Sequence, residues 1–95
     1  MNSFDQRQFE KMCKVIDSFK RKTISLSSFV SSMEFLFHAL ESVDISWEEE
    51  FLEEISSLES VNSGVPSSVS DEAVQKIIND AVEKLDTLIS QMLSR

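Results

Sequence analysis

Glycine and proline are almost absent from this chain. Its 95 residues include one glycine, Gly64, and one proline, Pro66. β-Hairpins and phosphate-binding loops depend on glycine for backbone conformations that other residues avoid, so neither is expected here. The apolar residues also recur every three or four positions, which is the period of an amphipathic helix. The sequence therefore predicts an all-α protein.

Four stretches show this period. A capping box of Ser46 and Glu49 is expected to start the third helix, and Ser70 is expected to start the fourth. The segment from Val61 to Ser68 contains the only glycine and proline and is predicted to be a loop. A chain of this length cannot support two cores, so we expect one domain over residues 1–95 that folds as a four-helix antiparallel bundle. The predicted helices span about residues 5–20, 25–41, 46–59 and 70–93.

The predicted last helix carries a long apolar stripe, made of Val74, Ile78, Ala81, Leu85, Leu88 and Met92. The stripe is about three residues wide per heptad, which favours packing within the bundle over a coiled-coil seam. A monomer is therefore expected, and a homodimer through this helix stays open.

The segment from Glu41 to Glu59 concentrates negative charge and has no lysine or arginine. On a helical wheel with Trp47 at 0°, the apolar set named below falls within about 80°, and the four outward glutamates fall between about 200° and 340°. Like charges at i,i+4 are mildly destabilising, so a basic partner would explain why they are concentrated. The alternative is that these glutamates are ordinary solvated surface and that Glu48 to Glu50 suit the positive end of the helix dipole. The apolar set is Trp47, Phe51, Ile55 and Leu58, and the outward glutamates are Glu49, Glu50, Glu53 and Glu54.

Catalytic and metal-binding patterns are missing from the sequence. Cys13 is the only cysteine and His38 the only histidine, and no glycine-rich turn could supply an oxyanion hole beside them. A buried cysteine and a half-buried histidine are the simpler interpretation. The paired glutamates lack a histidine at ligand spacing. We therefore expect no enzyme, with no catalytic residues, metal site or cofactor.

The charge balance also restricts the partners. A net charge of −8 has the wrong sign for direct nucleic-acid binding. No stretch of about 20 apolar residues and no leader is visible, so no membrane partner is expected and the cytoplasm is the expected compartment. A single cysteine also excludes an internal disulfide. Binding to a basic protein is the function class that remains.

Residues from Thr23 to Asn62 carry a family resemblance. The pattern consists of Ile24-Ser25-Leu26 at a helix start, Met33-Glu34 within that helix, Trp47, Phe51 and then Leu58-Glu59-Ser60-Val61. This pattern resembles small helical immunity proteins of bacterial contact-dependent growth inhibition systems, over roughly residues 9–90. Family members often carry a glycine shortly before the Ile-Ser-Leu and a second tryptophan near the Leu-Glu. Lys22 and Ile55 occupy the comparable places here, which leaves the subgroup and its toxin open.

The resemblance implies a partner, a cognate toxin domain from a neighbouring cell. Such toxins are frequently ribonucleases with basic clefts that act on transfer RNA, and an acidic helix would suit such a cleft. Trp47 could anchor the complex or could belong to the core with Phe51. Glu34 and Glu59 could form contacts between helices or touch the toxin. The predicted partner-binding residues are Glu41, Asp44, Trp47, Glu49, Glu50, Glu53 and Glu54.

Two other function classes use the same sequence features. A small acidic secretion chaperone or adaptor would bind a partner helix through the long C-terminal helix, and would normally be a dimer. A regulator that mimics nucleic acid would use the same carboxylates against a DNA-binding protein.

Overall fold

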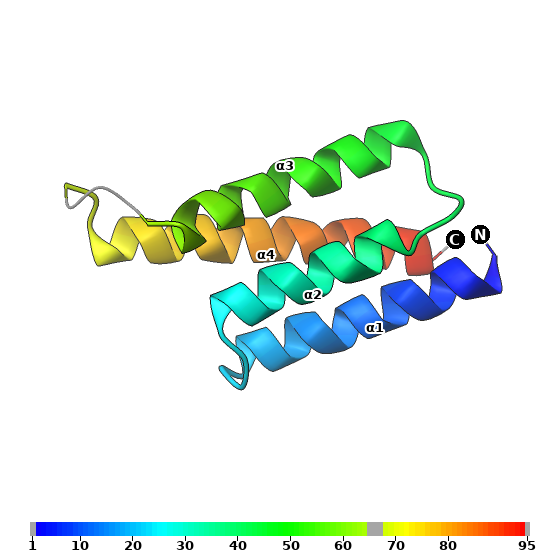
Figure 1. The fold of residues 1–95 in the computed structure, drawn as a ribbon, viewed down its shortest axis with the longest axis horizontal. Helices are drawn as coiled ribbons and strands as arrows, with labels where there is room; N and C mark the ends of the chain where they lie inside the picture. Colours follow the sequence, from blue (N-terminus) through cyan, green and yellow to red (C-terminus); the bar gives the residue numbers. More distant parts are fainter. Residues whose placement is uncertain (1, 65–67, 95) are drawn as a thin grey trace.

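The computed structural model describes residues 2–64 and 68–94 and confirms the all-α prediction, with four helices and no strand among them (Figure 1). Successive helices run antiparallel, so that the two ends of the chain lie at the same end of the bundle (Figure 1). Each helix packs against the next, and α4 packs against α1, which leaves α1 diagonal to α3 and α2 diagonal to α4. The helices are α1 (Ser3–Lys20), α2 (Leu26–His38), α3 (Ile45–Asn62) and α4 (Asp71–Leu93).

The predicted apolar stripes form the core. The ring of Trp47 on α3 meets Phe9 of α1 edge to face at 5.4 Å and stacks on Phe51 at 5.2 Å. Phe51 in turn stacks on Phe37 of α2, with ring centroids 4.8 Å apart. Aromatic pairs of this kind are stabilising beyond the area they bury. The other fully buried large side chains come from all four helices and include Met12, Phe29, Met33, Leu58, Leu85 and Ile89.

Both predicted boundaries of the third helix differ from those in the structure. The third helix begins at Ile45 with Asp44 as its N-cap residue, because the Asp44 carbonyl accepts the Glu48 amide at 3.0 Å. Ser46 therefore lies inside the helix and does not cap it. The same helix continues to Asn62, and the Ser63 amide closes its last turn by donating to the Glu59 carbonyl at 2.9 Å. The predicted loop from Val61 to Ser68 therefore begins two residues later, at Ser63, and its residues 65–67 lie outside the described part.

The second helix ends at His38 instead of near residue 41 because a long-range contact holds the following loop. Asp5 of α1 is fully buried, and its two carboxylate oxygens accept the backbone amides of Glu41 at 2.9 Å and Ser42 at 2.8 Å. A buried carboxylate is stable only when such donors surround it. Asp5 therefore fixes the α2–α3 loop, and with it the start of α3, against the first turn of α1.

We predict that Asp5→Ala lowers the free energy of unfolding by roughly 2 to 4 kcal/mol, since it removes two charge-assisted hydrogen bonds and leaves two amides without an acceptor. Asp5→Asn keeps one acceptor oxygen and should lose less. The control is Asp17→Ala, which breaks only an exposed pair with Arg21 and should cost at most about 1 kcal/mol. Urea denaturation followed by circular dichroism measures all three, and equal losses for Asp5→Ala and Asp17→Ala would contradict the assignment.

The end of α1 is a Schellman motif with lysine where glycine is usual. The Thr23 amide donates to the Ser18 carbonyl and the Lys22 amide donates to the Phe19 carbonyl, each at 3.0 Å. Lys22 has a φ of 63°, in the left-handed region that side chains with a Cβ atom disfavour. Lys22 is thus a strained residue.

We predict that Lys22→Gly raises the free energy of unfolding by about 0.5 to 1 kcal/mol, because relief of the left-handed strain exceeds the added entropy of the unfolded chain. Arg21→Gly is the matched control. Arg21 precedes Lys22 at a φ of −81°, where glycine relieves no strain, so the same change there should lower stability. Thermal and urea unfolding check both variants, and destabilisation by Lys22→Gly would reject the strain.

Candidate partner-binding surface

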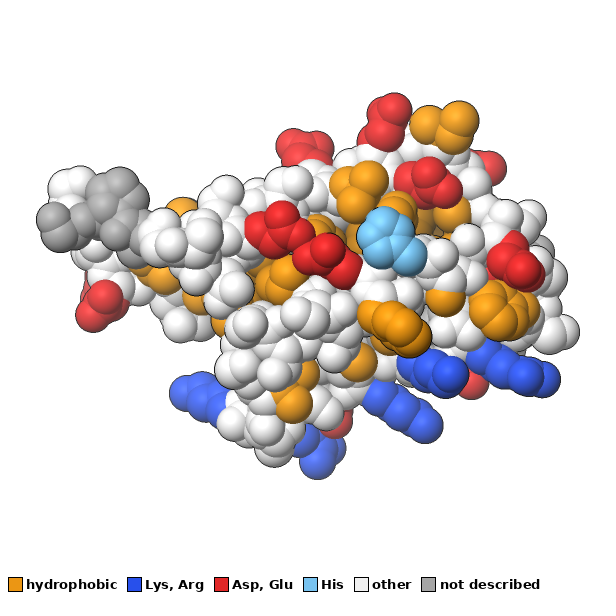
Figure 2. Space-filling view, in the orientation of Figure 1, with side chains coloured by type: hydrophobic (Ala, Val, Ile, Leu, Met, Phe, Trp, Pro, Cys, Tyr) orange, Lys and Arg blue, Asp and Glu red, His pale blue; other side chains and the backbone are white. Residues whose placement is uncertain are grey.

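The outward face of α3 is acidic because its opposite face is buried. Trp47, Phe51, Ile55 and Leu58 all lie in the core, as their spacing predicts. This rotation exposes Glu49, Glu50 and Glu53, and leaves Glu48 half-buried in the first turn. Figure 2 shows carboxylates over the α3 edge of the molecule. The acidic face is defined here as Glu48, Glu49 and Glu53 together with the two other exposed residues between them on α3, Glu50 and Leu52.

Glu54 differs from the other three predicted glutamates. Its side chain is only 13% exposed, and the ammonium nitrogen of Lys84 on α4 lies 3.7 Å from its carboxylate. Glu54 therefore forms one wall of a groove between α3 and α4, about 420 Å³ in volume, rather than part of the open face. The groove is lined by Glu50, Glu53, Glu54, Glu83, Lys84, Thr87, Leu88 and Gln91.

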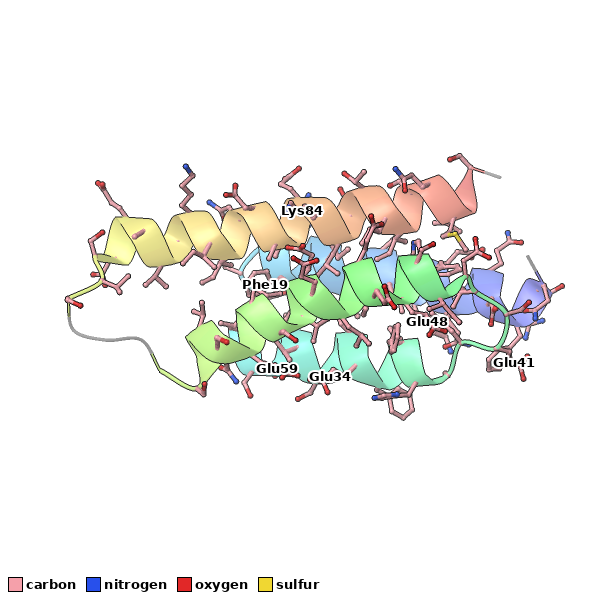
Figure 3. The ribbon with its side chains drawn as sticks, turned by 90° about the horizontal axis from the view of Figure 1, so that it is seen from above. Phe19, Glu34, Glu41, Glu48, Glu59 and Lys84 are labelled. Carbon is pink, nitrogen blue, oxygen red and sulfur yellow. The ribbon has the colours of Figure 1, made fainter. Side chains whose placement is uncertain are left out.

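The two predicted loop residues lie at the end of the acidic face. Glu41 and Asp44 are both exposed in the connection between α2 and α3. Glu41 lies next to the start of α1, where its amide donates to Asp5 (Figure 3). Asp44 directly precedes the first turn of α3. The loop therefore extends the negative charge beyond the helix, along one end of the bundle.

Trp47 belongs to the core, which is one of the two roles that the sequence left open. Its side chain is 6% exposed, and its indole N–H donates to the Leu88 carbonyl of α4 at 3.0 Å. A side chain with both its ring and its polar atom engaged inside the protein is not available as an interface anchor without rearrangement. Trp47 positions the acidic face and does not form part of it.

Two exposed apolar residues on the same face were missed by the sequence reasoning. Ile45 is 72% exposed and Leu52 is 42% exposed, although both are large and apolar. They are seven residues apart, so they lie above one another on the helix, with Glu48 and Glu49 between them. Plotting every residue of α3 on the wheel, at about 160° for Ile45 and 140° for Leu52, would have found them. The face thus combines an apolar pair with surrounding carboxylates.

Cys13 and His38 do not come together. Cys13 is half-buried beside α4, where burial is the main cause that raises the pKa of its thiol and the charges of Asp86 and Glu10 add to it. His38 lies at the C-terminal end of α2 and is exposed, so the predictions of a half-buried histidine and a buried cysteine are both wrong. In the described residues, no group of histidine, cysteine, aspartate or glutamate side chains has the arrangement of a metal site.

Glu34 and Glu59 meet between α2 and α3 (Figure 3). A hydrogen bond between the two side chains is the main cause that raises the pKa of Glu34 above its ordinary value, and partial burial and the charge of Glu59 act in the same direction. The pair is therefore an interhelix contact, which is one of the two roles expected for these residues.

Comparisons of the chain with family models, with curated proteins and with solved structures found no match. Within residues 2–64 and 68–94, no helix combines the length and the apolar character needed to cross a membrane.

We predict that Glu34→Gln stabilises the protein at neutral pH by about a few tenths of a kcal/mol, the scale of an exposed like-charge pair. A raised folded-state pKa means that the folded protein holds this proton more tightly than the unfolded chain does. The interaction therefore contributes stability at acid pH, and the contribution is lost as the pH rises through the folded-state pKa. Glutamine keeps a hydrogen-bond donor at every pH.

The advantage of Glu34→Gln should accordingly vanish below the ordinary glutamate pKa of 4.5. Unfolding free energies measured from about pH 4 to pH 8 test this pH dependence. In a double-mutant cycle, the pH-dependent effect of Glu34→Gln should be much smaller once Glu59 is glutamine, because only the effect of partial burial then continues to raise the pKa of Glu34. An effect of undiminished size in that background would show that Glu59 is not the main cause of the raised pKa.

Proposed function

We propose that this protein is an immunity protein that binds and neutralises a cognate toxin domain, a basic nuclease of the transfer-RNA-cleaving kind, by covering its active-site cleft with the acidic face of α3. The resemblance to immunity proteins of contact-dependent growth inhibition supports the class of partner. The observation that carries the proposal is the exposed Ile45 and Leu52 pair surrounded by glutamates.

The charges account for fast encounter. A chain with net charge −8 that concentrates its carboxylates on one helix presents an anionic surface where a nuclease expects phosphates. Complementary potentials of this kind raise association rates by about 10- to 1000-fold at low salt. Glu49, Glu50 and Glu53 contact toxin lysines and arginines in the proposed complex, and Glu41 and Asp44 extend the contact.

The apolar pair accounts for retention after encounter. Burial of Ile45 and Leu52 against the toxin would remove apolar surface from water, which charge pairs at a wet rim do not achieve. These two residues take the anchoring role that the sequence had suggested for Trp47. A toxin lysine or arginine that entered the α3–α4 groove would meet Glu50, Glu53 and Glu83, since Lys84 already lies 3.7 Å from the carboxylate of Glu54.

The chaperone alternative is less well supported by the packing. It requires α4 to offer its apolar stripe to a partner, and Ala81, Leu85, Leu88 and Met92 of that stripe are buried within the bundle. The nucleic-acid mimic uses the same carboxylates as the immunity protein and differs only in its target. In this proposal the protein acts as a monomer in the cytoplasm, without a cofactor.

The toxin used in the test is the C-terminal domain of a large secreted protein. We expect that protein to be encoded directly upstream. Glu49→Lys with Glu53→Lys should slow association by about tenfold or more, reduce its salt dependence and abolish protection of cells that make the toxin. Ile45→Ser with Leu52→Ser should mainly accelerate dissociation. Stopped-flow kinetics at several salt concentrations and a growth assay measure these effects.

The matched control is Glu72→Lys with Asp80→Lys, which makes the same change in net charge on exposed positions of α4. This control should retain protection. Circular dichroism must show an unchanged helical spectrum in all variants. Unaltered affinity of the α3 variants would show that the acidic face is only solvated surface, and a toxin domain that the wild-type protein does not bind would reject the function.

A further inference from the structure

The face formed by α1 and α2 contains a hollow that the proposed function does not use. It has a volume of about 400 Å³ and is lined by Lys11, Val15, Ser31, Ser32, Phe35 and Leu36. Ser31 and Ser32 are small, so the two helices leave space above Val15 and Leu36. The hollow therefore has a partly apolar lining and is open at the surface.

Phe35 stands beside this hollow and is 75% exposed, more than any other large apolar residue in the described part of the chain. It lies off the core stripe of α2, to which Phe29, Met33 and Leu36 belong. A single exposed phenylalanine is ordinary on a protein surface, but one that borders an open hollow can complete a pocket for an incoming apolar side chain.

The charges around the hollow are positive in a strongly acidic protein. Arg7, Lys11 and Lys14 are exposed on α1 at intervals of four and three, and so form one row. None of the six residues that line the hollow is acidic. Figure 2 shows this basic edge along α1, away from the carboxylates over α3.

The other α1 carboxylates do not neutralise this row. Glu10 is a helix neighbour of both Arg7 and Lys14, but its carboxylate accepts the Gln6 side-chain amide at 3.3 Å, and within the described residues it forms no ion pair with either of them. Asp17 is paired with Arg21 at 3.0 Å. The row of Arg7, Lys11 and Lys14 therefore faces solvent with its charge available.

We propose that the α1–α2 face binds an acidic amphipathic helix of a second partner protein. One apolar side chain of that helix fills the hollow against Phe35, and its carboxylates pair with Arg7, Lys11 and Lys14. A basic row with spacing four and three matches acidic residues at the same spacing on a helix that packs alongside α1. Because α1 is diagonal to α3 in the bundle, this face and the acidic face can be occupied together.

Other occupants fit the observations less well. The same face of a second copy would bring two basic rows together, and like charges repel. A nucleic acid would meet one exposed aromatic residue in the hollow and a net charge of −8. An anionic membrane surface would leave the concave hollow unfilled.

The experiment lets the protein select its ligand. A displayed library of randomised peptides of about 16 residues on a helical framework, long enough to form a helix when bound, is enriched on the wild-type protein. We expect enriched peptides to be acidic, with apolar residues at helical spacing. Their affinity should fall about tenfold or more in Phe35→Ser and in Lys11→Glu, and should fall as salt is raised.

The matched controls are Ile77→Ser for the apolar change and Lys76→Glu for the charge change, both at exposed positions of α4. Neither should alter peptide binding. The acidic-face variant Glu49→Lys with Glu53→Lys should also leave peptide binding intact, so failure here is distinguishable from failure of the immunity function. Basic peptides, no enrichment, or binding that survives Phe35→Ser would each overturn the proposal.

Binding to other classes is tested with the same variants. Phosphatidylglycerol vesicles, a single-stranded oligonucleotide and self-association measured by sedimentation are compared for wild-type protein and Phe35→Ser. Dependence of any of these three on Phe35, with no acidic peptide selected, would assign the face to that occupant and reject the proposed one.

Discussion

The indole of Trp47 is the point at which all four helices are held in one arrangement. Its ring meets Phe9 of α1 and Phe51 of its own helix, and Phe51 continues the stack to Phe37 of α2. Its N–H donates to the Leu88 carbonyl of α4. Since α1 and α3 lie diagonally, only a large side chain directed through the centre can join them. If α3 rotated, the buried indole N–H would lose this hydrogen bond and be left desolvated without a partner, which is unfavourable. The hydrogen bond therefore determines the rotation of α3 closely.

That rotation has a direct consequence for the surface. Once Trp47 and Phe51 face inward, the helical period directs Glu49 and Glu53 outward, together with Ile45 and Leu52. The buried carboxylate of Asp5 acts in the same direction, because it fixes the loop that leads into α3. The acidic face is thus positioned by two buried polar contacts, and none of the exposed glutamates on it is needed to hold the bundle together.

Much of the fold follows from local sequence signals, and the exceptions arise from contacts between distant residues. The period of the apolar residues predicted the helices, their order and the buried stripe of α3. It did not predict that Asp5 would accept hydrogen bonds from the amides of Glu41 and Ser42. These residues are 36 and 37 positions away, and no local sequence pattern around Asp5 indicates a contact over that separation. The start of α3 was misplaced for a related reason: Ser46 and Glu49 match a capping box, but the fixed loop lets the helix start earlier, at Ile45.

The candidate site shows the same division. Exposure of Glu49, Glu50 and Glu53 followed from the wheel, whereas the burial of Glu54 against Lys84 required knowledge of where α4 lies. The separation of stabilising and exposed residues on α3 also bears on how such a surface could change. Substitutions at Ile45, Glu49 or Leu52 alter the face without entering the core, so their cost in stability is small. A protein built in this way can acquire a new partner by changing its surface while Trp47 and Asp5 preserve the geometry on which that surface is displayed.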